Sequence, residues 1–207
     1  GLSYTDFEIT GCALKAVSAE KIRVTATVRN TGNVSGKEVV QVYASLPGGI
    51  LEKEAHRLAA YAKTNELKPG EAQEVTMEVK MDGLTSYDEK RAAWILESGF
   101  YGIWVGNSLA SAKLCGGIKL DQEVIRRQVR NLFPLKQELE EISQEASKTA
   151  KRAAAAAQQA KEEELTVLNI RGADIATETV EYKKNADLYE KEAMDFVNTL
   201  SEENLID

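Results

Sequence analysis

The chain has 207 residues, of which 43% are hydrophobic and 29% charged, and its formal net charge is −7. It contains no apolar run long enough to cross a membrane, so we expect no membrane partner. Residues 1–120 hold 14 basic and 14 acidic residues, and the whole net charge therefore lies in residues 121–207. An acidic tail on a neutral domain argues against nucleic acid, because phosphate binding requires clustered Lys and Arg.

The first two expected strands cover residues 4–17 and 21–30. The first is broken at Gly11, because a glycine within a strand usually marks a bulge or a kink. The second has one apolar face and one polar face, which predicts a sheet with a buried side and a solvent side. The apolar residues of this second strand are Ile22, Val24, Ala26 and Val28.

A third strand follows the turn residues of 30–33 and directs four apolar residues inward, namely Val40, Val42, Ala44 and Leu46. Tyr43 then points outward, where it either contacts a neighbouring domain or is an ordinary exposed tyrosine. The loop that follows, residues 47–58, contains His56, the single histidine of the chain. No serine, cysteine or carboxylate is placed by the sequence to form a triad with it, so we expect a solvated loop histidine.

Residues 67–71, Leu-Lys-Pro-Gly-Glu, predict a turn, since proline presets the first turn position and glycine tolerates the second. The next strand alternates, with Val75, Met77, Val79 and Met81 on its buried face. Residues 96–101 then bring Tyr101 to the head of another strand. This pattern is typical of a tyrosine corner, in which the hydroxyl bonds to backbone upstream in a sandwich domain.

Several of these stretches together resemble a known family. They are GLSYT at residues 1–5, RNTGNVSGKEVVQVYAS at 29–45, ELKPGE at 66–71, SYDE at 86–89, the single Trp94 between the last two matches, and GFYGIWVGNS at 99–108. They resemble the fibronectin type III-like domain of family 3 glycoside hydrolases, the β-glucosidases and their relatives. Glu54 departs from that pattern, and so does Ala60-Tyr61, where the family has glycine and phenylalanine. The resemblance implies an immunoglobulin or fibronectin III-like sandwich over residues 1–120.

Three aromatic residues and two cysteines are considered together. Trp104 is out of phase with its apolar neighbours and points away from the core, so we expect burial against a partner domain rather than a sugar platform. Tyr43, Tyr61 and Trp104 are thus the candidate interdomain or ligand contacts. Cys12 and Cys115 lie near the two ends of the sandwich; a bridge is conceivable, but we expect free, packed thiols.

Residues 121–207 predict an α-helical extension. Pro134 begins an expected helix whose apolar stripe narrows from leucine to alanine. The stripe consists of Leu135, Leu139, Ile142, Ala146, Thr149, Ala153, Ala157 and Ala160. This helix is either packed closely on a domain or semi-detached. Residues 165–182 read as an extended linker over apolar surface. A second helix from about Tyr182 carries Tyr189, Ala193, Phe196 and Leu200 on one face, and Ser201 begins another.

The closing residues 193–207 are similar to the segment that precedes the (β/α)8 barrel of family 3 enzymes, although Asn204 departs from it. The resemblance therefore implies a reversed domain order, with this chain between the two catalytic domains of one polypeptide. It implies an aspartate nucleophile and a glutamate acid/base outside these residues. We accordingly name no catalytic, cofactor-binding or metal residue and no cofactor, and expect the chain itself to be inactive.

The resulting hypothesis is a non-catalytic scaffold of a glycosidase that acts on carbohydrate, with the two catalytic domains as its partners. The alternative is a stand-alone glycan- or protein-binding module that uses the exposed aromatic residues. A third possibility is oligomerisation through the alanine-rich helix. The sequence leaves the location of the protein open, with the cytoplasm favoured.

Overall fold

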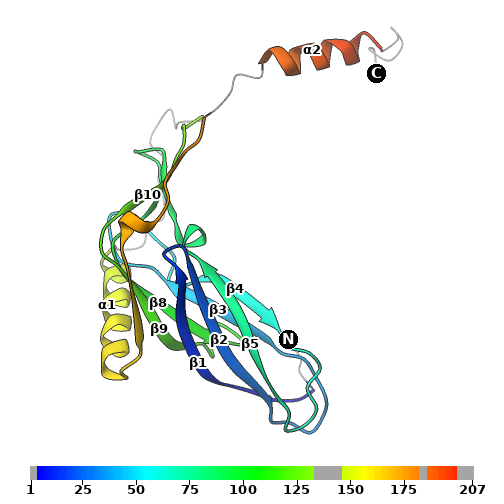
Figure 1. Ribbon diagram of the computed structural model, residues 1–207, viewed down its shortest axis with the longest axis vertical. Helices are drawn as coiled ribbons and strands as arrows, with labels where there is room; N and C mark the ends of the chain where they lie inside the picture. Colours follow the sequence, from blue (N-terminus) through cyan, green and yellow to red (C-terminus); the bar gives the residue numbers. More distant parts are fainter. Residues whose placement is uncertain (1–3, 133–145, 182–185, 200–207) are drawn as a thin grey trace.

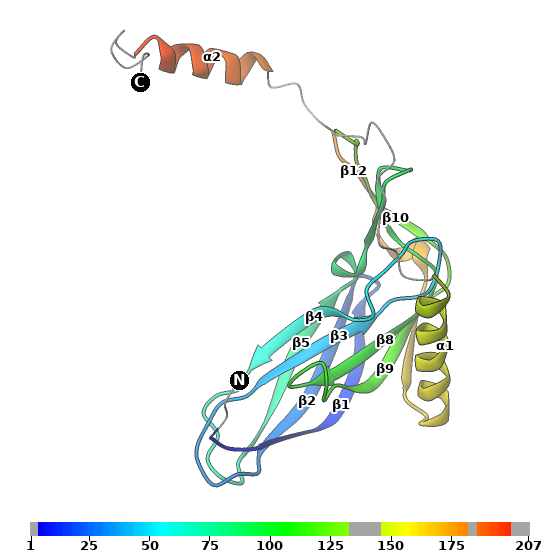
Figure 2. The same ribbon diagram turned by 180° about the vertical axis from the view of Figure 1, so that it is seen from behind.

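The computed structural model of the protein describes residues 4–132, 146–181 and 186–199. These residues form a mostly β structure with three sheets and two α-helices. Figures 1 and 2 show two of the sheets stacked as a sandwich, with helix α1 lying along one of them. The expected sandwich is confirmed, whereas the helical extension is smaller than expected because the tail also contributes strands.

The first sheet is antiparallel and has the order β1-β2-β5. Its strands are β1 (Phe7–Ser18), β2 (Lys21–Asn30) and β5 (Ala72–Lys80). Gly11 has φ of +60° and lies where the register of β1 against β2 shifts, so the predicted kink is confirmed. All four apolar residues predicted inward on β2 are fully buried, as alternation on a half-buried sheet requires.

The second sheet has five strands in the order β11-β9-β8-β3-β4. They are β3 (Val39–Ser45), β4 (Arg57–Lys63), β8 (Gly99–Gly106), β9 (Lys113–Leu120) and β11 (Thr166–Ile170). The stretch expected to be a linker thus contains β11, which pairs in parallel with β9. The predicted domain boundary near Leu120 falls at the end of β9, and the division into two units stays a prediction.

The core lies between these two sheets and ends at a tyrosine corner. The Tyr101 side chain is 1% exposed, and its hydroxyl donates a hydrogen bond of 2.7 Å to the Glu97 carbonyl. Burial raises the pKa of Tyr101 well above its ordinary value, which keeps the hydroxyl protonated as a donor. The predicted tyrosine corner is therefore confirmed.

A smaller third sheet extends from one end of the sandwich, with the order β12-β10-β7-β6. Its strands are β6 (Ser86–Asp88), β7 (Ala93–Leu96), β10 (Val124–Gln128) and β12 (Glu178–Thr179). The short 3₁₀ helix η1 (Met81–Leu84) leads into it. Arg126 and Arg127 of β10 approach the Asp82 carboxylate at 3.3 and 3.5 Å, so charge pairs join this sheet to η1.

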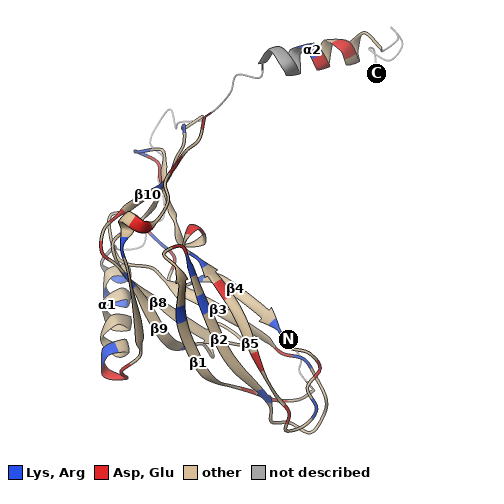
Figure 3. Cartoon of the chain, in the orientation of Figure 1, with Lys and Arg blue, Asp and Glu red and all other residues tan. Residues whose placement is uncertain are grey.

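Helix α1 (Ala146–Glu162) lies between β9 and β11 in sequence and packs on β8 and β9. Its buried residues recur at helical spacing and are Thr149, Ala153, Ala156 and Ala160. Ala156 is buried in place of the predicted Ala157. Of the two alternatives, the packed helix is therefore the correct one, and the alanine stripe is used within the chain. Figure 3 shows basic residues along this helix and acidic residues at its C-terminal end.

The close approach of α1 depends on two glycines that face it. A side chain on Gly48 would collide with the Ala150 backbone. A Cβ on Gly102 of β8 would lie 3.3 Å from the Ala156 Cβ, tighter than an ordinary van der Waals contact. Small residues on both partners thus allow the helix to lie against the sheet.

The remaining described helices of the tail are a short 3₁₀ helix and a second α-helix. The 3₁₀ helix η2 (Gly172–Asp174) precedes Ile175, which is buried in the sandwich core together with Ile170. Helix α2 (Ala186–Val197) confirms that a second helix follows, and its Phe196 side chain is 64% exposed. Five residues of the predicted helices lie outside the described part of the chain, namely Leu135, Leu139, Ile142, Leu200 and Ser201.

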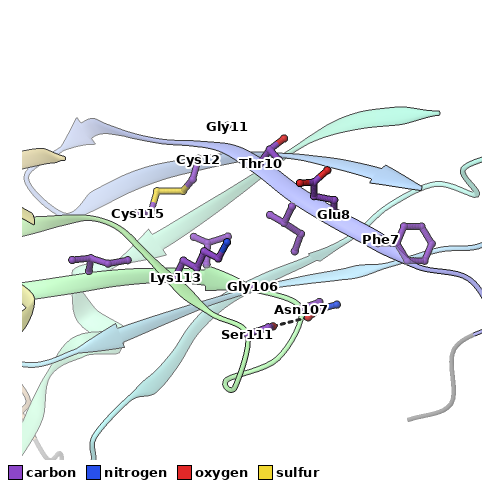
Figure 4. A pocket seen from close by; sticks show the side chains of 13 residues that line it. Phe7, Glu8, Thr10, Gly11, Cys12, Gly106, Asn107, Ser111, Lys113 and Cys115 are labelled. Carbon is purple, nitrogen blue, oxygen red and sulfur yellow. Dashed lines mark hydrogen bonds between the residues drawn. A yellow bond between two sulfur atoms is a disulfide. The ribbon is translucent and has the colours of Figure 1, made fainter. Parts of the chain in front are cut away.

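The cysteines correct one expectation. Cys12 of β1 and Cys115 of β9 form a disulfide, with 5.8 Å between their Cα atoms, so the prediction of free thiols was wrong. The reason is that the first sheet packs on the second and so brings these two residues, 103 positions apart in sequence, next to each other. Figure 4 shows the bridge in an open groove of about 430 Å³, with Glu8 and Thr10 on one side and Lys113 on the other.

Candidate interdomain and ligand face

The three aromatic residues singled out from the sequence lie on the outer face of the five-stranded sheet. Tyr43 pairs with Trp104 across β3 and β8, and Tyr61 of β4 pairs with Gln41, two residues before Tyr43. Directly opposed residues in antiparallel strands point to the same side of a sheet. Because the core occupies the inner side, all three aromatic side chains project outward, as the strand phase predicts.

One half of this face, over β3 and β4, is open. Tyr61 is 70% exposed, and Leu58, which is opposite Tyr43, is 52% exposed. Tyr43 is half-buried, and its hydroxyl donates a hydrogen bond to the Gln41 carboxamide oxygen. This open half therefore combines apolar and aromatic surface with a fixed amide, a composition found in the centres of protein interfaces.

The other half, over β8 and β9, is covered by α1. Trp104 lies at the edge of this covered half and is partly buried. Its indole Nε1 donates a 3.0 Å hydrogen bond to the Ser45 hydroxyl, and the His56 ring meets it edge-on at 5.2 Å between centroids. Trp104 is thus held in one orientation by two neighbours from its own chain.

A cavity of about 340 Å³ opens between Trp104 and α1. The sandwich supplies Ser45, His56 and Trp104, and the helix supplies Arg152 and Gln159. The sequence analysis did not single out the two helix residues, because nothing local shows that α1 would lie beside Trp104. Of the three candidate contact residues, Trp104 lines this cavity, whereas Tyr43 and Tyr61 lie on the open half.

His56 is not the solvated loop histidine that the sequence suggested. Desolvation by burial, with a smaller effect of the Arg152 charge, lowers the pKa of its imidazole. The ring is therefore neutral at pH 7 and has one nitrogen that donates and one that accepts a hydrogen bond. It faces Trp104 rather than a nucleophile.

The loop that carries His56 is anchored by a buried ion pair. The Lys53 ammonium contacts the Glu97 carboxylate, and the two side chains are 2% and 6% exposed. Lys53 also donates to the carbonyls of Pro47 and Leu51, and Glu97 accepts a 2.5 Å hydrogen bond from the Ile50 amide. Because both buried charges also bond to the backbone of the loop, they anchor it beside the tyrosine corner.

Two carboxylates near the third sheet are engaged in charge pairs. Asp88 accepts a 2.5 Å hydrogen bond from Arg91, which holds the pKa of that carboxyl below its ordinary value. Asp82 pairs with two arginines of β10. The Asp88 carboxyl therefore stays ionised at neutral pH and is poorly suited to donate a proton there.

Two absences hold for residues 4–132, 146–181 and 186–199, the part of the chain that the structure describes. In it, no cluster of three or more His, Cys, Asp or Glu residues is arranged to hold a metal ion. None of its helices combines the length and hydropathy that a membrane span requires.

Residues 38–109 match the family model of the fibronectin type III-like domain. The chain contains a fibronectin type III-like domain. The resemblance inferred from the sequence motifs is therefore confirmed, and the matched region includes the tyrosine corner, Tyr43, Tyr61 and Trp104.

The chain is similar to parts of several β-glucosidases and of exo-α-(1→6)-L-arabinopyranosidases. The chain is 43% identical over 118 residues to β-glucosidase A of Butyrivibrio fibrisolvens, a match that covers 55% of this chain and 14% of that protein. It is 39% identical over 141 residues to a β-glucosidase of Ruminococcus albus, with 65% and 15% covered.

Solved structures give the same result. β-Glucosidase 3B of Thermotoga neapolitana, in complex with glucose, is 38% identical with a TM-score of 0.55, and the match covers 59% of this chain and 17% of that one. A Paenibacillus barengoltzii β-glucosidase is 33% identical with a TM-score of 0.58, covering 63% and 16%. A GH3 β-glucosidase of Bifidobacterium adolescentis is 29% identical with a TM-score of 0.56, covering 65% and 20%. The chain thus corresponds to a small part of each of these relatives.

Proposed function

We propose that the chain is a non-catalytic structural part of a larger GH3-type glycosidase. The observation that carries the proposal is the match of its fibronectin type III-like domain to β-glucosidases of which it spans only 14 to 17%. On this proposal the partners are the catalytic domains of the same polypeptide, and the carbohydrate substrate binds to them.

The surface that supports such packing is the open half of the outer face. Leu58 and Tyr61 expose apolar area there, next to the half-buried Tyr43. Burying a side chain such as leucine contributes roughly 1.5 to 3 kcal/mol, so a neighbouring domain gains from covering these positions. The anchored loop with the Lys53–Glu97 pair lies at the end of β3 and holds the edge of this surface in place.

The tail supports the proposed position in the parent enzyme. Residues 121–207 contain α1 and α2, and we propose that they connect the sandwich to a (β/α)8 barrel that follows in the reversed domain order. In this arrangement α1 fixes the start of the connector on the sandwich, because its stripe is buried against β8 and β9.

A chimera tests this function. Residues 4–132 would replace the matching segment of the Butyrivibrio fibrisolvens β-glucosidase A, and hydrolysis of 4-nitrophenyl β-D-glucoside would be measured. We expect an active chimera that loses activity and thermal stability when Leu58→Asp and Tyr61→Asp are combined, while the exposed Val17→Asp has little effect. Glycosidase activity of the isolated 207-residue chain would refute the proposal.

A second candidate is a glycan- or protein-binding module, and one observation favours it. The cavity beside Trp104 pairs an aromatic wall with polar side chains, as ligand sites do. Chemical shifts of Trp104 induced by a sugar would support this candidate, whereas shifts confined to Tyr43 and Tyr61 on addition of the catalytic domains would support the first.

A further inference from the structure

The cavity between Trp104 and α1 has the size and walls of a small-ligand site. Its volume of about 340 Å³ lies near the lower end of the roughly 300 to 1,000 Å³ typical of ligand pockets, which suits one six-membered ring rather than a chain of rings. It is built from segments that are distant in sequence, the end of β3, the loop before β4, strand β8 and helix α1.

The aromatic wall of this cavity is fixed before any ligand enters. Ser45 accepts the Trp104 Nε1 hydrogen bond and His56 packs edge-on against the indole. Gly102 permits this arrangement, because a Cβ there would lie 3.0 Å from the indole Nε1. A preset aromatic ring costs little conformational entropy on binding.

Four polar side chains line the cavity, of which Arg152 only donates hydrogen bonds and the other three both donate and accept them. Gln159 has a carboxamide, Ser45 a hydroxyl and His56 a neutral imidazole, and each of these groups can do both. Sugar hydroxyls have the same double character, and the C–H groups on one face of a pyranose are apolar enough to lie on an indole. The cavity therefore combines the two surfaces that such a ring presents.

We propose that this cavity binds a neutral pyranose, with the apolar face of the sugar on Trp104 and its hydroxyls bonded to Gln159 and His56. The proposal rests on the second candidate function and deepens it, because it narrows the ligand to a single sugar ring and adds Gln159 and His56 as contacts that the sequence did not indicate. It requires α1, and it does not involve Tyr43 or Tyr61.

The chain provides its own reporters for a test by NMR. It has two tryptophans and one histidine, so the indole and imidazole signals are few and readily assigned with a Trp94→Phe variant. Trp94 lies in β7 of the third sheet against Tyr87 and serves as the internal control. D-Glucose, D-galactose, D-mannose and D-xylose would be titrated separately into the full chain. We expect at least one sugar to shift the Trp104 and His56 signals with the same Kd, in the millimolar range, while the Trp94 signal does not move.

Two neighbouring glutamines supply a matched pair of variants. Gln159 donates a 2.9 Å hydrogen bond to Glu163, and Gln158, one position away and exposed, donates a 2.7 Å hydrogen bond to Glu162. Gln159→Ala removes a proposed sugar contact and should weaken binding about fivefold, the loss expected for one hydrogen bond. Gln158→Ala removes the same kind of helix contact and should leave the Kd unchanged.

Three results would overturn the proposal. They are the absence of saturable shifts with all four sugars, equal movement of Trp94 and Trp104, and equal weakening by the two glutamine variants. None of these results bears on the chimera experiment, which measures packing of the open half of the face, so the two proposals fail independently.

Discussion

Breaking the bond between Cys12 and Cys115 tests how the two sheets of the sandwich are held together. The bridge joins β1 to β9, and it closes a loop between residues 103 positions apart. In the chain-entropy model, a loop of about 100 residues contributes about 4.7 kcal/mol by restricting the unfolded chain. Measured effects are commonly lower, so we expect reduction to cost about 3 to 4 kcal/mol of unfolding free energy.

Urea unfolding followed by tryptophan fluorescence gives this quantity. The oxidised chain, the same chain with dithiothreitol, and the Cys12→Ala/Cys115→Ala variant would be compared. Reduction leaves every side chain in place and isolates the bond, whereas the variant also removes two sulfur atoms. We expect both forms without the bridge, the reduced chain and the variant, to unfold at a lower urea concentration than the oxidised chain. Their Tm should be lower by on the order of 10 °C. Dithiothreitol should have no effect on the variant.

Thiol titration in denaturant decides whether the reasoning holds. The untreated chain should contain no reactive thiol and the reduced chain two. Two thiols in the untreated chain would refute the bridge, and an unchanged urea midpoint after complete reduction would refute its stabilising effect. Disulfides persist in oxidising compartments, so a confirmed bridge would favour a location outside the reducing cytosol, contrary to the preference drawn from the sequence.

Three further substitutions test the anchored corner and the docked helix. Tyr101→Phe leaves the buried Glu97 carbonyl without its donor and should cost about 1 to 2 kcal/mol in urea unfolding; an unchanged midpoint would contradict this role. Lys53→Met isolates the Glu97 carboxylate and should cost about 3 to 5 kcal/mol, most of which the added Glu97→Leu change should restore; a double variant as unstable as the single one would contradict it. Ala156→Leu should overpack the helix against the sheet by about 1 to 3 kcal/mol and increase amide exchange in α1, whereas Ala154→Leu on the exposed side should not; equal exchange in both variants would contradict the docking.

The sequence predicts well those parts of the fold that depend on residues close together in the chain. The alternation in residues 21–30 gave the correct buried face because a half-buried strand has a period of two. The kink at Gly11 and the corner at Tyr101 were also predicted, since each depends on a few adjacent residues. Strand β11 was missed because five residues without alternation form a strand only when β9 offers its edge.

The candidate site shows the same division between local and distant information. The outward direction of Trp104 follows from strand phase alone. Its neighbours His56 and Gln159 come from a loop and from a helix that lie far away in sequence, and only the crossover from β9 to β11 brings that helix alongside. The Lys53–Glu97 pair was missed for the same reason, because neither residue has a local pattern that signals burial.

The parallel pairing of β11 with β9 also sets an order of events during translation. At 5 to 20 residues per second, the ribosome delivers Ile170 about 3 to 10 s after Leu120. Through that interval the nascent sheet ends at β9, whose backbone groups are an open template for another strand. For the first part of the interval helix α1 is also missing. A ribosome that stalls between these two points therefore presents a sandwich with a bare edge, to which a strand of another chain can add.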